Sequence, residues 1–209
     1  MNLDEKLAAR QYRSLAAMTM PQEQARKRID CTRYVEGYAA RFEPYVLYDL
    51  EDGPIYETFE RGCFAAADMS DIIMQYNHQG RVLARLSNGS LIVEPDDNGL
   101  FVAANLDLTE ASRQLFEEIK TRLVTKMSWG FVCGDYDYNP ETRTITHHTV
   151  KKIFDVSAVS IPANDTTEIN ARAWADGVIG FAARSEAALE ERRRKLRLKI
   201  KIQEDFKHE

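Results

Sequence analysis

The feature that most constrains the fold is a series of short segments rich in β-branched and aromatic residues between residues 31 and 161. Segments of this composition, bounded by turn residues, are typical of β-strands. About seven or eight strands therefore have to share one core, with few helices between them. The predicted strands are 32–42, 55–64, 82–86, 90–94, 100–106, 126–133 and 152–161, with further apolar or β-branched runs at 72–78 and 143–150.

Two helices are predicted among these strands. The clearest spans residues 109–123, where apolar residues recur at every fourth position, and Thr109 is its expected N-cap. A short helix is expected near 65–69, and Asn88-Gly89 predicts a two-residue hairpin turn. The fold class is therefore predicted as α+β and mainly β, a small closed β-barrel of about seven strands with helices packed around it.

The amino-acid composition of the chain changes at both ends. The predicted regions are a polar N-terminal arm, a barrel domain and a charged C-terminal tail, over residues 1–28, 29–175 and 176–209. In the tail, residues 185–195 are helical by composition, whereas the alternation over 196–202 fits either a strand or a charged helix. Glutamates at helical spacing beside the basic run 192–195 favour a solvated, salt-bridged helix over a nucleic-acid contact.

Composition excludes several classes of protein. The net charge of −5 predicts no specific nucleic-acid binding, which requires a basic surface. No apolar run approaches the roughly 20 residues of a membrane helix. The N-terminus lacks the apolar core of a signal peptide, so we expect the chain to stay in the cytoplasm where it is made. Cys31, Cys63 and Cys133 are odd in number and widely spaced, which predicts small buried side chains rather than disulfides or a zinc site.

Three strand-like segments each contain one reactive or orienting side chain. Ser128 lies in a strand whose odd-numbered residues are apolar, so its hydroxyl is expected on the opposite face, where Gly130 leaves room for a substrate backbone. A serine hydroxyl needs a base within about 3 Å to take its proton. His78, at the end of an apolar run, is the best candidate for that base, and Asp155, in an apolar strand, is the expected partner of its second ring nitrogen.

Other histidines are weaker candidates for the base. His147 and His148 point to opposite faces if they lie on a strand, so at most one of them could reach a given site. His208 lies in the terminal tail. Each member of the trio also has an ordinary structural explanation, and the chemistry of the residues alone leaves that alternative open.

Several short motifs follow one another in a characteristic order from about Val35 to Ala171. They are Glu36-Gly37-Tyr38-Ala39, the acidic segment 57–64 ending in Gly-Cys-Phe, Asn77-His78, Ser128-Trp129-Gly130-Phe131 and the Asp-Val-Ser…Pro-Ala-Asn segment at 155–164. In this order they resemble the prohead (capsid maturation) proteases of tailed bacteriophages, serine peptidases with a fold related to herpesvirus assemblin.

The resemblance implies a role for each residue of the trio. His78 would be the general base, Ser128 the nucleophile and Asp155 the third member, although the family usually has glutamate at the position of Asp155. Arg85 or Arg81 would help to position a loop that stabilises the oxyanion, and the sequence does not decide between them.

The resemblance also implies a function. The chain would be a serine endopeptidase that cleaves the scaffold or the major capsid protein precursor, and then itself, inside the assembling prohead in the host cytoplasm. It implies no metal or organic cofactor and leaves a homodimer open. One alternative is a catalytically inactive scaffold-binding or capsid-assembly module on the same fold. A metallohydrolase using His78, His147 or His148 is disfavoured because the chain has no HExxH or comparable ligand spacing.

Overall fold

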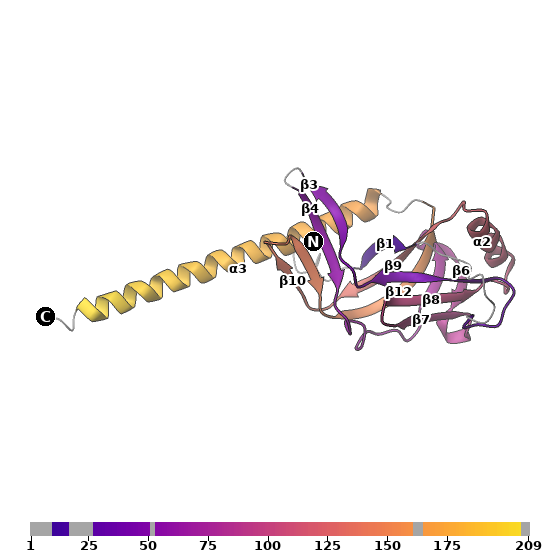
Figure 1. The fold of residues 1–209 in the computed structure, drawn as a ribbon, viewed down its shortest axis with the longest axis horizontal. Coiled ribbons are helices and arrows are strands. Elements are labelled where there is room, and N and C mark those ends of the chain that lie inside the picture. The colour runs from indigo at the N-terminus through magenta and orange to yellow at the C-terminus, as the bar shows by residue number, and fades with distance from the viewer. Residues whose placement is uncertain (1–9, 17–26, 51–52, 161–164, 206–209) are drawn as a thin grey trace.

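The computed structural model describes residues 10–16, 27–50, 53–160 and 165–205. These ranges form a mixed α+β fold that consists mostly of strands, with two α-helices, α2 and α3 (Figure 1). No helix in these ranges is long and apolar enough to cross a membrane.

The largest sheet has five strands in the order β1-β9-β12-β5-β6. Strand β9 lies between β1 and β12 and is antiparallel to both, whereas β12 and β5 are parallel. This sheet brings together segments that are far apart in the sequence. Its strands are β1 (Gln11–Ala16), β9 (Lys126–Cys133), β12 (Val150–Val159), β5 (Ile73–Tyr76) and β6 (Gln79–Arg85).

Two smaller sheets complete the strand structure. The four-stranded sheet has the order β10-β11-β4-β3, and the three-stranded sheet has the order β2-β8-β7. The strands of the first are β10 (Tyr136–Asn139), β11 (Thr144–His147), β4 (Gly53–Phe59) and β3 (Tyr45–Leu50). Those of the second are β2 (Tyr34–Arg41), β8 (Gly99–Asn105) and β7 (Leu91–Pro95).

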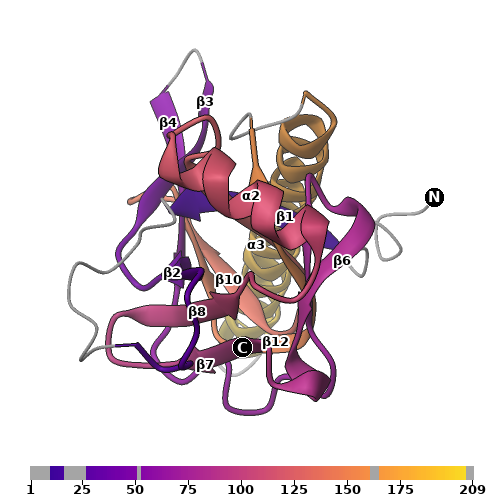
Figure 2. The same ribbon diagram turned by 90° about the vertical axis from the view of Figure 1, so that its right-hand side faces the viewer.

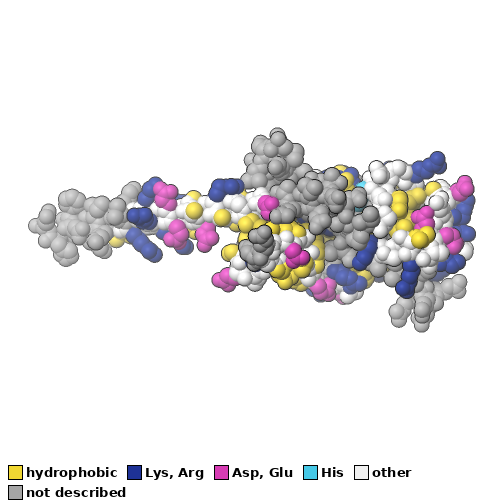
Figure 3. All heavy atoms as spheres, turned by 90° about the horizontal axis from the view of Figure 1, so that it is seen from above, with side chains coloured by type: hydrophobic (Ala, Val, Ile, Leu, Met, Phe, Trp, Pro, Cys, Tyr) yellow, Lys and Arg dark blue, Asp and Glu magenta, His cyan; other side chains and the backbone are white. Residues whose placement is uncertain are grey.

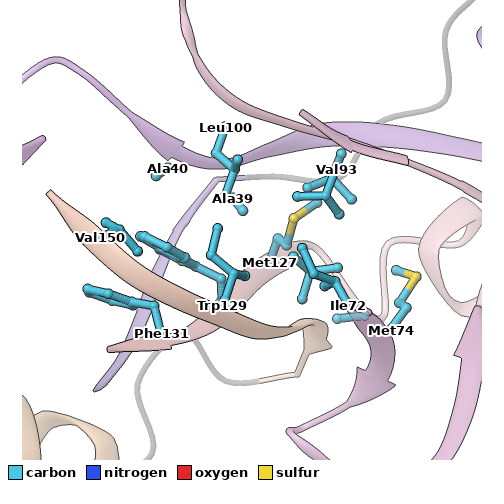
Figure 4. Close-up of a cluster of buried hydrophobic side chains, with 14 of the residues drawn as sticks. Ala39, Ala40, Ile72, Met74, Val93, Leu100, Met127, Trp129, Phe131 and Val150 are labelled. Carbon is cyan, nitrogen blue, oxygen red and sulfur yellow. The ribbon is translucent and has the colours of Figure 1, made fainter. Parts of the chain in front are cut away.

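Part of the hydrophobic core lies between the largest sheet and the three-stranded sheet (Figure 4). Alternate residues of β9, Met127, Trp129 and Phe131, are fully buried there. They pack in one cluster with Ala39 of β2 and Leu100 of β8. Burying side chains of this size stabilises the fold by about 1.5–3 kcal/mol each. The core therefore fixes which face of β9 carries Ser128.

Helix α2 (Glu110–Lys120) covers one end of the strand structure beside β6 (Figure 2). Thr109 is its N-cap, as predicted, and its hydroxyl accepts a hydrogen bond from the Ser112 amide at 3.1 Å. The Ser112 hydroxyl donates to the Leu83 carbonyl of β6 at 2.7 Å, and Leu115 and Ile119 are buried. This contact ties the helix to β6.

Helix α3 (Asp165–Asp205) settles the choice between strand and helix in the C-terminal region in favour of a helix. Its first part packs on the body through Trp174, Ala175 and Val178, and the rest extends away from the strands (Figure 1). Charges of both signs line this extension (Figure 3). Ion pairs at helical spacing, among them Arg193 with Glu190, agree with the predicted salt-bridged helix.

Four structural details differ from the sequence-based predictions. Hydrogen-bonded turns over residues 61–66 replace the short helix expected near 65–69. No hairpin forms at Asn88-Gly89, because β6 and β7 belong to different sheets and the 3₁₀ turn Leu86–Asn88 connects them. Residues Gln11–Ala16 of the predicted arm form β1 in the largest sheet.

The fourth difference is the number of strands. The described residues contain twelve strands in three separately hydrogen-bonded sheets, and closure into a barrel stays a prediction. The predicted strand end at Pro162 and the candidate base His208 lie outside the described residues.

A buried ionic network holds β1 in place. Both Glu57 carboxylate oxygens accept from the Arg13 guanidinium, at 2.5 and 2.8 Å, and Arg13 and Glu57 are 3 % and 0 % exposed. Glu57 also contacts His147 Nε2 at 2.8 Å and accepts from the Tyr45 hydroxyl. Burial would raise the pKa of Glu57, but Arg13 and the bond to His147 hold that pKa well below its usual value. The network joins β1 to the four-stranded sheet.

Replacing Glu57 with glutamine should destabilise the fold by about 3–5 kcal/mol, because it leaves the buried Arg13 guanidinium without its counter-charge. Urea unfolding measures the loss. Asp71→Asn is the control, since it breaks an exposed ion pair with Arg85 and should change stability far less. Equal losses in the two variants would show that the buried pair does not anchor the strand.

Candidate active site

Ser128 lies on β9, between β1 and β12 in the largest sheet, on the face turned away from the core. It is paired with Ser157 of β12 on one side and with Ser14 of β1 on the other. The alternation predicted for this strand is confirmed, because its odd-numbered residues fill the core. Ser128 itself is 2 % exposed.

His78 lies in the tight turn between β5 and β6. Tyr76 pairs with Gln79, so the turn consists of Asn77 and His78, which have φ angles of 49° and 59°. Positive φ at both central residues is typical of a type I′ hairpin turn. The Asn77 amide donates to the Ala158 carbonyl of β12 at 3.0 Å, which ties the turn to the strand of Asp155. The backbone thus directs His78 across the sheet.

The three predicted residues come together in one chain of contacts. His78 Nε2 lies 2.7 Å from Ser128 Oγ, and His78 Nδ1 lies 2.5 Å from Asp155 Oδ2. With the proton on Nδ1, the ring donates to the carboxylate and its Nε2 is free to accept the serine proton. His78 is 15 % exposed and Asp155 is fully buried.

Asp155 has partners for both of its oxygens. The Ser157 hydroxyl donates to Oδ2 at 2.8 Å, and the Arg10 guanidinium forms an ion pair with Oδ1. A Cβ at Gly130 would lie 2.5 Å from Oδ1 and 2.7 Å from Arg10 Nε. The space above Gly130, expected to receive a substrate backbone, is therefore filled by the Asp155 and Arg10 side chains, and the glycine is needed for their approach.

The surroundings of His78 favour its neutral form. Burial, and after it the Arg10 guanidinium, lower the pKa of the imidazole below its usual value. The ring is therefore neutral near pH 7, the state in which it can accept a proton from a hydroxyl.

Comparison with known proteins identifies the family. A family model described as caudovirus prohead serine protease matches residues 22–176, about three quarters of the chain. The chain belongs to this family. Neither the curated proteins nor the solved structures contain a match. Membership makes the chain a serine peptidase of bacteriophage capsid maturation, which acts on capsid proteins inside the assembling capsid.

The remaining candidate histidines of this prohead protease lie elsewhere. His147 is fully buried in the Glu57 network, with its ring stacked between Phe59 at 4.5 Å and Trp174 at 5.3 Å. His148 pairs on the surface with Glu60 at 2.8 Å. Within the described ranges, no group of three or more His, Cys, Asp or Glu residues is placed to hold a metal ion.

The two arginines considered for the oxyanion loop take different positions. Arg85 forms an exposed ion pair with Asp71, whereas Arg81 lines a cavity of about 430 Å³. This cavity lies between α2 and the β5–β6 hairpin, and Asn77 and Gln79, the neighbours of His78, form part of its wall. The other lining residues are Tyr76, Gly80, Leu83, Ala111, Gln114, Leu115 and Glu118.

Sequence reasoning missed three residues of the site. Ser157 and Arg10 contact Asp155, and the Tyr12 ring lies 4.3 Å from the His78 ring at an angle of 60°. Arg10 and Tyr12 are on or beside β1, in the segment predicted as a polar arm. No local pattern marks Arg10 and Tyr12, since their partners lie more than sixty residues away along the chain, whereas Ser157 is two residues from Asp155 on the same strand.

Proposed function

We propose that this family member is an endopeptidase in which Ser128 is the nucleophile, His78 the general base and Asp155 the residue that orients the histidine. Its substrates are the scaffold or the major capsid protein precursor, followed by the protease itself. It acts in the host cytoplasm, within the assembling prohead. The observation that carries the proposal is the position of the His78 ring between Ser128 Oγ, at 2.7 Å, and Asp155 Oδ2, at 2.5 Å.

The reaction follows from this geometry. Ser128 Oγ attacks the carbonyl carbon of the scissile peptide while its proton passes to His78 Nε2. Asp155 stabilises the imidazolium that forms, and backbone N–H groups hold the negative oxygen of the tetrahedral intermediate. The proton on Nε2 then passes to the leaving amine, which leaves an acyl-enzyme. Water attacks the ester, its proton goes to Nε2, and the return of that proton to Oγ releases the acid and restores the serine.

Covalent labelling tests the nucleophile directly. A fluorophosphonate should react with the full chain, and peptide mass mapping should place the adduct on Ser128. A chelator should not change the extent of labelling. The catalytically inactive alternative predicts no adduct, and a metallohydrolase predicts activity that a chelator abolishes. Labelling at another residue would contradict the proposal.

The cavity beside His78 is suited to bind side chains of the substrate. Its lining combines Leu83, Ala111 and Leu115 with amide and charged side chains, so it fits side chains with an apolar stem and a polar end. A volume of about 430 Å³ exceeds that of one side chain, so the cavity can hold more than one side chain of the substrate.

Filling this cavity should weaken substrate binding without changing the reactivity of Ser128. Ala111→Trp is expected to lower kcat/KM for a capsid-protein substrate about tenfold or more, because it excludes apolar substrate groups worth about 1.5–3 kcal/mol each. The rate of fluorophosphonate labelling should stay unchanged, since the small probe does not need the cavity. The control is Glu117→Trp, on the exposed face of α2. Equal kcat/KM values for the two variants would contradict this use of the cavity.

A further inference from the structure

Strand β1 lies directly beside the candidate nucleophile, although it falls outside the residues 22–176 that the family model matches. Its backbone places Tyr12 opposite Gly130 and Ser14 opposite Ser128. Alternate residues of β1 therefore share the face of the sheet on which His78, Ser128 and Asp155 meet. Gln11 and Arg13 point to the other face and are buried.

Tyr12 of β1 contacts the histidine, and Arg10, the residue before β1, contacts the aspartate. The Tyr12 ring lies 4.3 Å from the His78 ring, and the Arg10 guanidinium lies 5.0 Å from the Tyr12 ring and 4.5 Å from the Phe154 ring. Arg10 also forms the ion pair with Asp155 Oδ1. Phe154, Arg10, Tyr12 and His78 thus form one continuous series of contacts beside the site.

The Arg13–Glu57 ion pair holds β1 in a fixed position. Arg13, next to Tyr12 in the chain, makes a two-point contact with the buried Glu57 carboxylate at 2.5 and 2.8 Å. Breaking a buried pair of this kind is strongly unfavourable, so β1 keeps its register against β9. Tyr12 and Arg10 therefore have defined positions relative to His78.

We propose that β1 and the residue before it, Arg10, belong to the catalytic site. Tyr12 positions the His78 ring, and Arg10 shares the Asp155 carboxylate with His78. This inference rests on the proposed function and adds two positioning residues to it. Neither is expected to touch the scissile bond.

The effect of Arg10 follows from the charges that face His78. These are the Asp155 carboxylate from β12, which favours the imidazolium, and the guanidinium of Arg10, the residue before β1, which disfavours it. Tyr12 contributes an aromatic ring and Ser128 a hydroxyl. Removing the Arg10 charge should therefore raise the pKa of His78. Because the base must be neutral to act, the acid limb of kcat/KM should then move to higher pH.

The effect of Tyr12 is geometric. His78 has the uncommon positive φ of 59°, and its side chain reaches over the sheet to Ser128. The aromatic ring of Tyr12 packs against one side of the imidazole and limits its rotation, which keeps Nε2 within reach of Oγ. Phenylalanine should preserve this contact, and alanine should remove it.

The test uses the full chain and five variants. Arg10→Gln removes the charge, and Tyr12→Ala is compared with the conservative Tyr12→Phe. Arg33→Gln is the matched control for the first, because Arg33 also pairs with an aspartate and its side chain is 33 % exposed, against 35 % for Arg10. Tyr38→Ala, which removes a ring packed on Phe101 in the three-stranded sheet, is the control for the second.

Two measurements are made on each variant. Peptidase assays give kcat, KM and the pH profile, and NMR titration of the imidazole protons gives the pKa of His78, with assignment through His78→Gln. The NMR measurement does not require activity, so it judges this inference even if the chain proves to have no peptidase activity, which would contradict the proposed function alone.

We expect Arg10→Gln to raise the pKa of His78 by roughly half a unit or more, with a parallel shift in the pH profile. We expect Tyr12→Ala to lower kcat about tenfold with little change in KM, to remove the ring-current shift of the His78 protons, and to be rescued by phenylalanine. An unchanged pKa of His78 in Arg10→Gln, or losses in Tyr12→Ala no larger than in Tyr38→Ala, would overturn the inference.

Discussion

Replacing Ser128 with alanine is expected to lower turnover of a capsid-protein substrate by up to about 10⁶-fold. The substitution removes the atom that forms the acyl-enzyme and leaves only the contribution of substrate binding and oxyanion stabilisation. Because the hydroxyl is small and 2 % exposed, alanine fits the same space and the fold should be retained. Product formation during co-expression with the cognate capsid protein, followed by mass spectrometry, measures the loss.

The matched control is Ser90→Ala. Ser90 is similarly buried, at 3 % exposure, but its hydroxyl bonds to Asn88 and to the Arg85 backbone, away from His78. This variant should keep turnover close to that of the unmodified chain. If Ser128→Ala cleaves the substrate as fast as Ser90→Ala, Ser128 is not the nucleophile.

Asp155→Asn is expected to lower kcat by about 10⁴-fold, by analogy with the same change in other serine peptidases. The amide has nearly the shape of the carboxylate, but it cannot stabilise the imidazolium, and its NH₂ group favours the wrong tautomer of His78. The loss should fall on kcat rather than on KM, because Asp155 is fully buried and contacts His78 rather than solvent.

Asp68→Asn provides the comparison for this prediction. Asp68 pairs with Lys152, which lies on the same strand as Asp155, but on the surface. Its replacement should leave kcat unchanged. A kcat for Asp155→Asn within tenfold of this control would show that the carboxylate is not the orienting group.

The elements with strong local patterns were predictable from the sequence. The bounds predicted for β9 agree with the structure because its alternation puts Met127, Trp129 and Phe131 into the core. The helix with Thr109 at its N-cap was predicted for a similar reason, since both the cap and the apolar spacing act within one element.

The turn that carries His78 shows where local rules failed. Asn88-Gly89 has the stronger hairpin signal, yet the strands beside it belong to different sheets. The actual tight hairpin uses Asn77-His78, without glycine, and is held by the bond from Asn77 to Ala158 of a distant strand. Tertiary contacts therefore decide this turn.

Long-range charge pairing explains why β1 was missed. Arg13 was placed in a polar arm because its partner, Glu57, lies 44 residues away along the chain. Arg10 likewise pairs with Asp155, which lies near the other end of the chain's central region. Patterns of charge along the chain carry no information on such pairs. His78, Ser128 and Asp155 could be proposed because few residue types can act as nucleophile, base and orienting acid, and because the motifs around them resemble a known family.

A crystal structure of the fluorophosphonate adduct would show which atom is the nucleophile. We expect a covalent bond from Ser128 Oγ to phosphorus, with His78 Nε2 within about 3 Å of that oxygen and Asp155 bonded to Nδ1. An adduct on another residue, or His78 and Asp155 lying away from a modified Ser128, would contradict it.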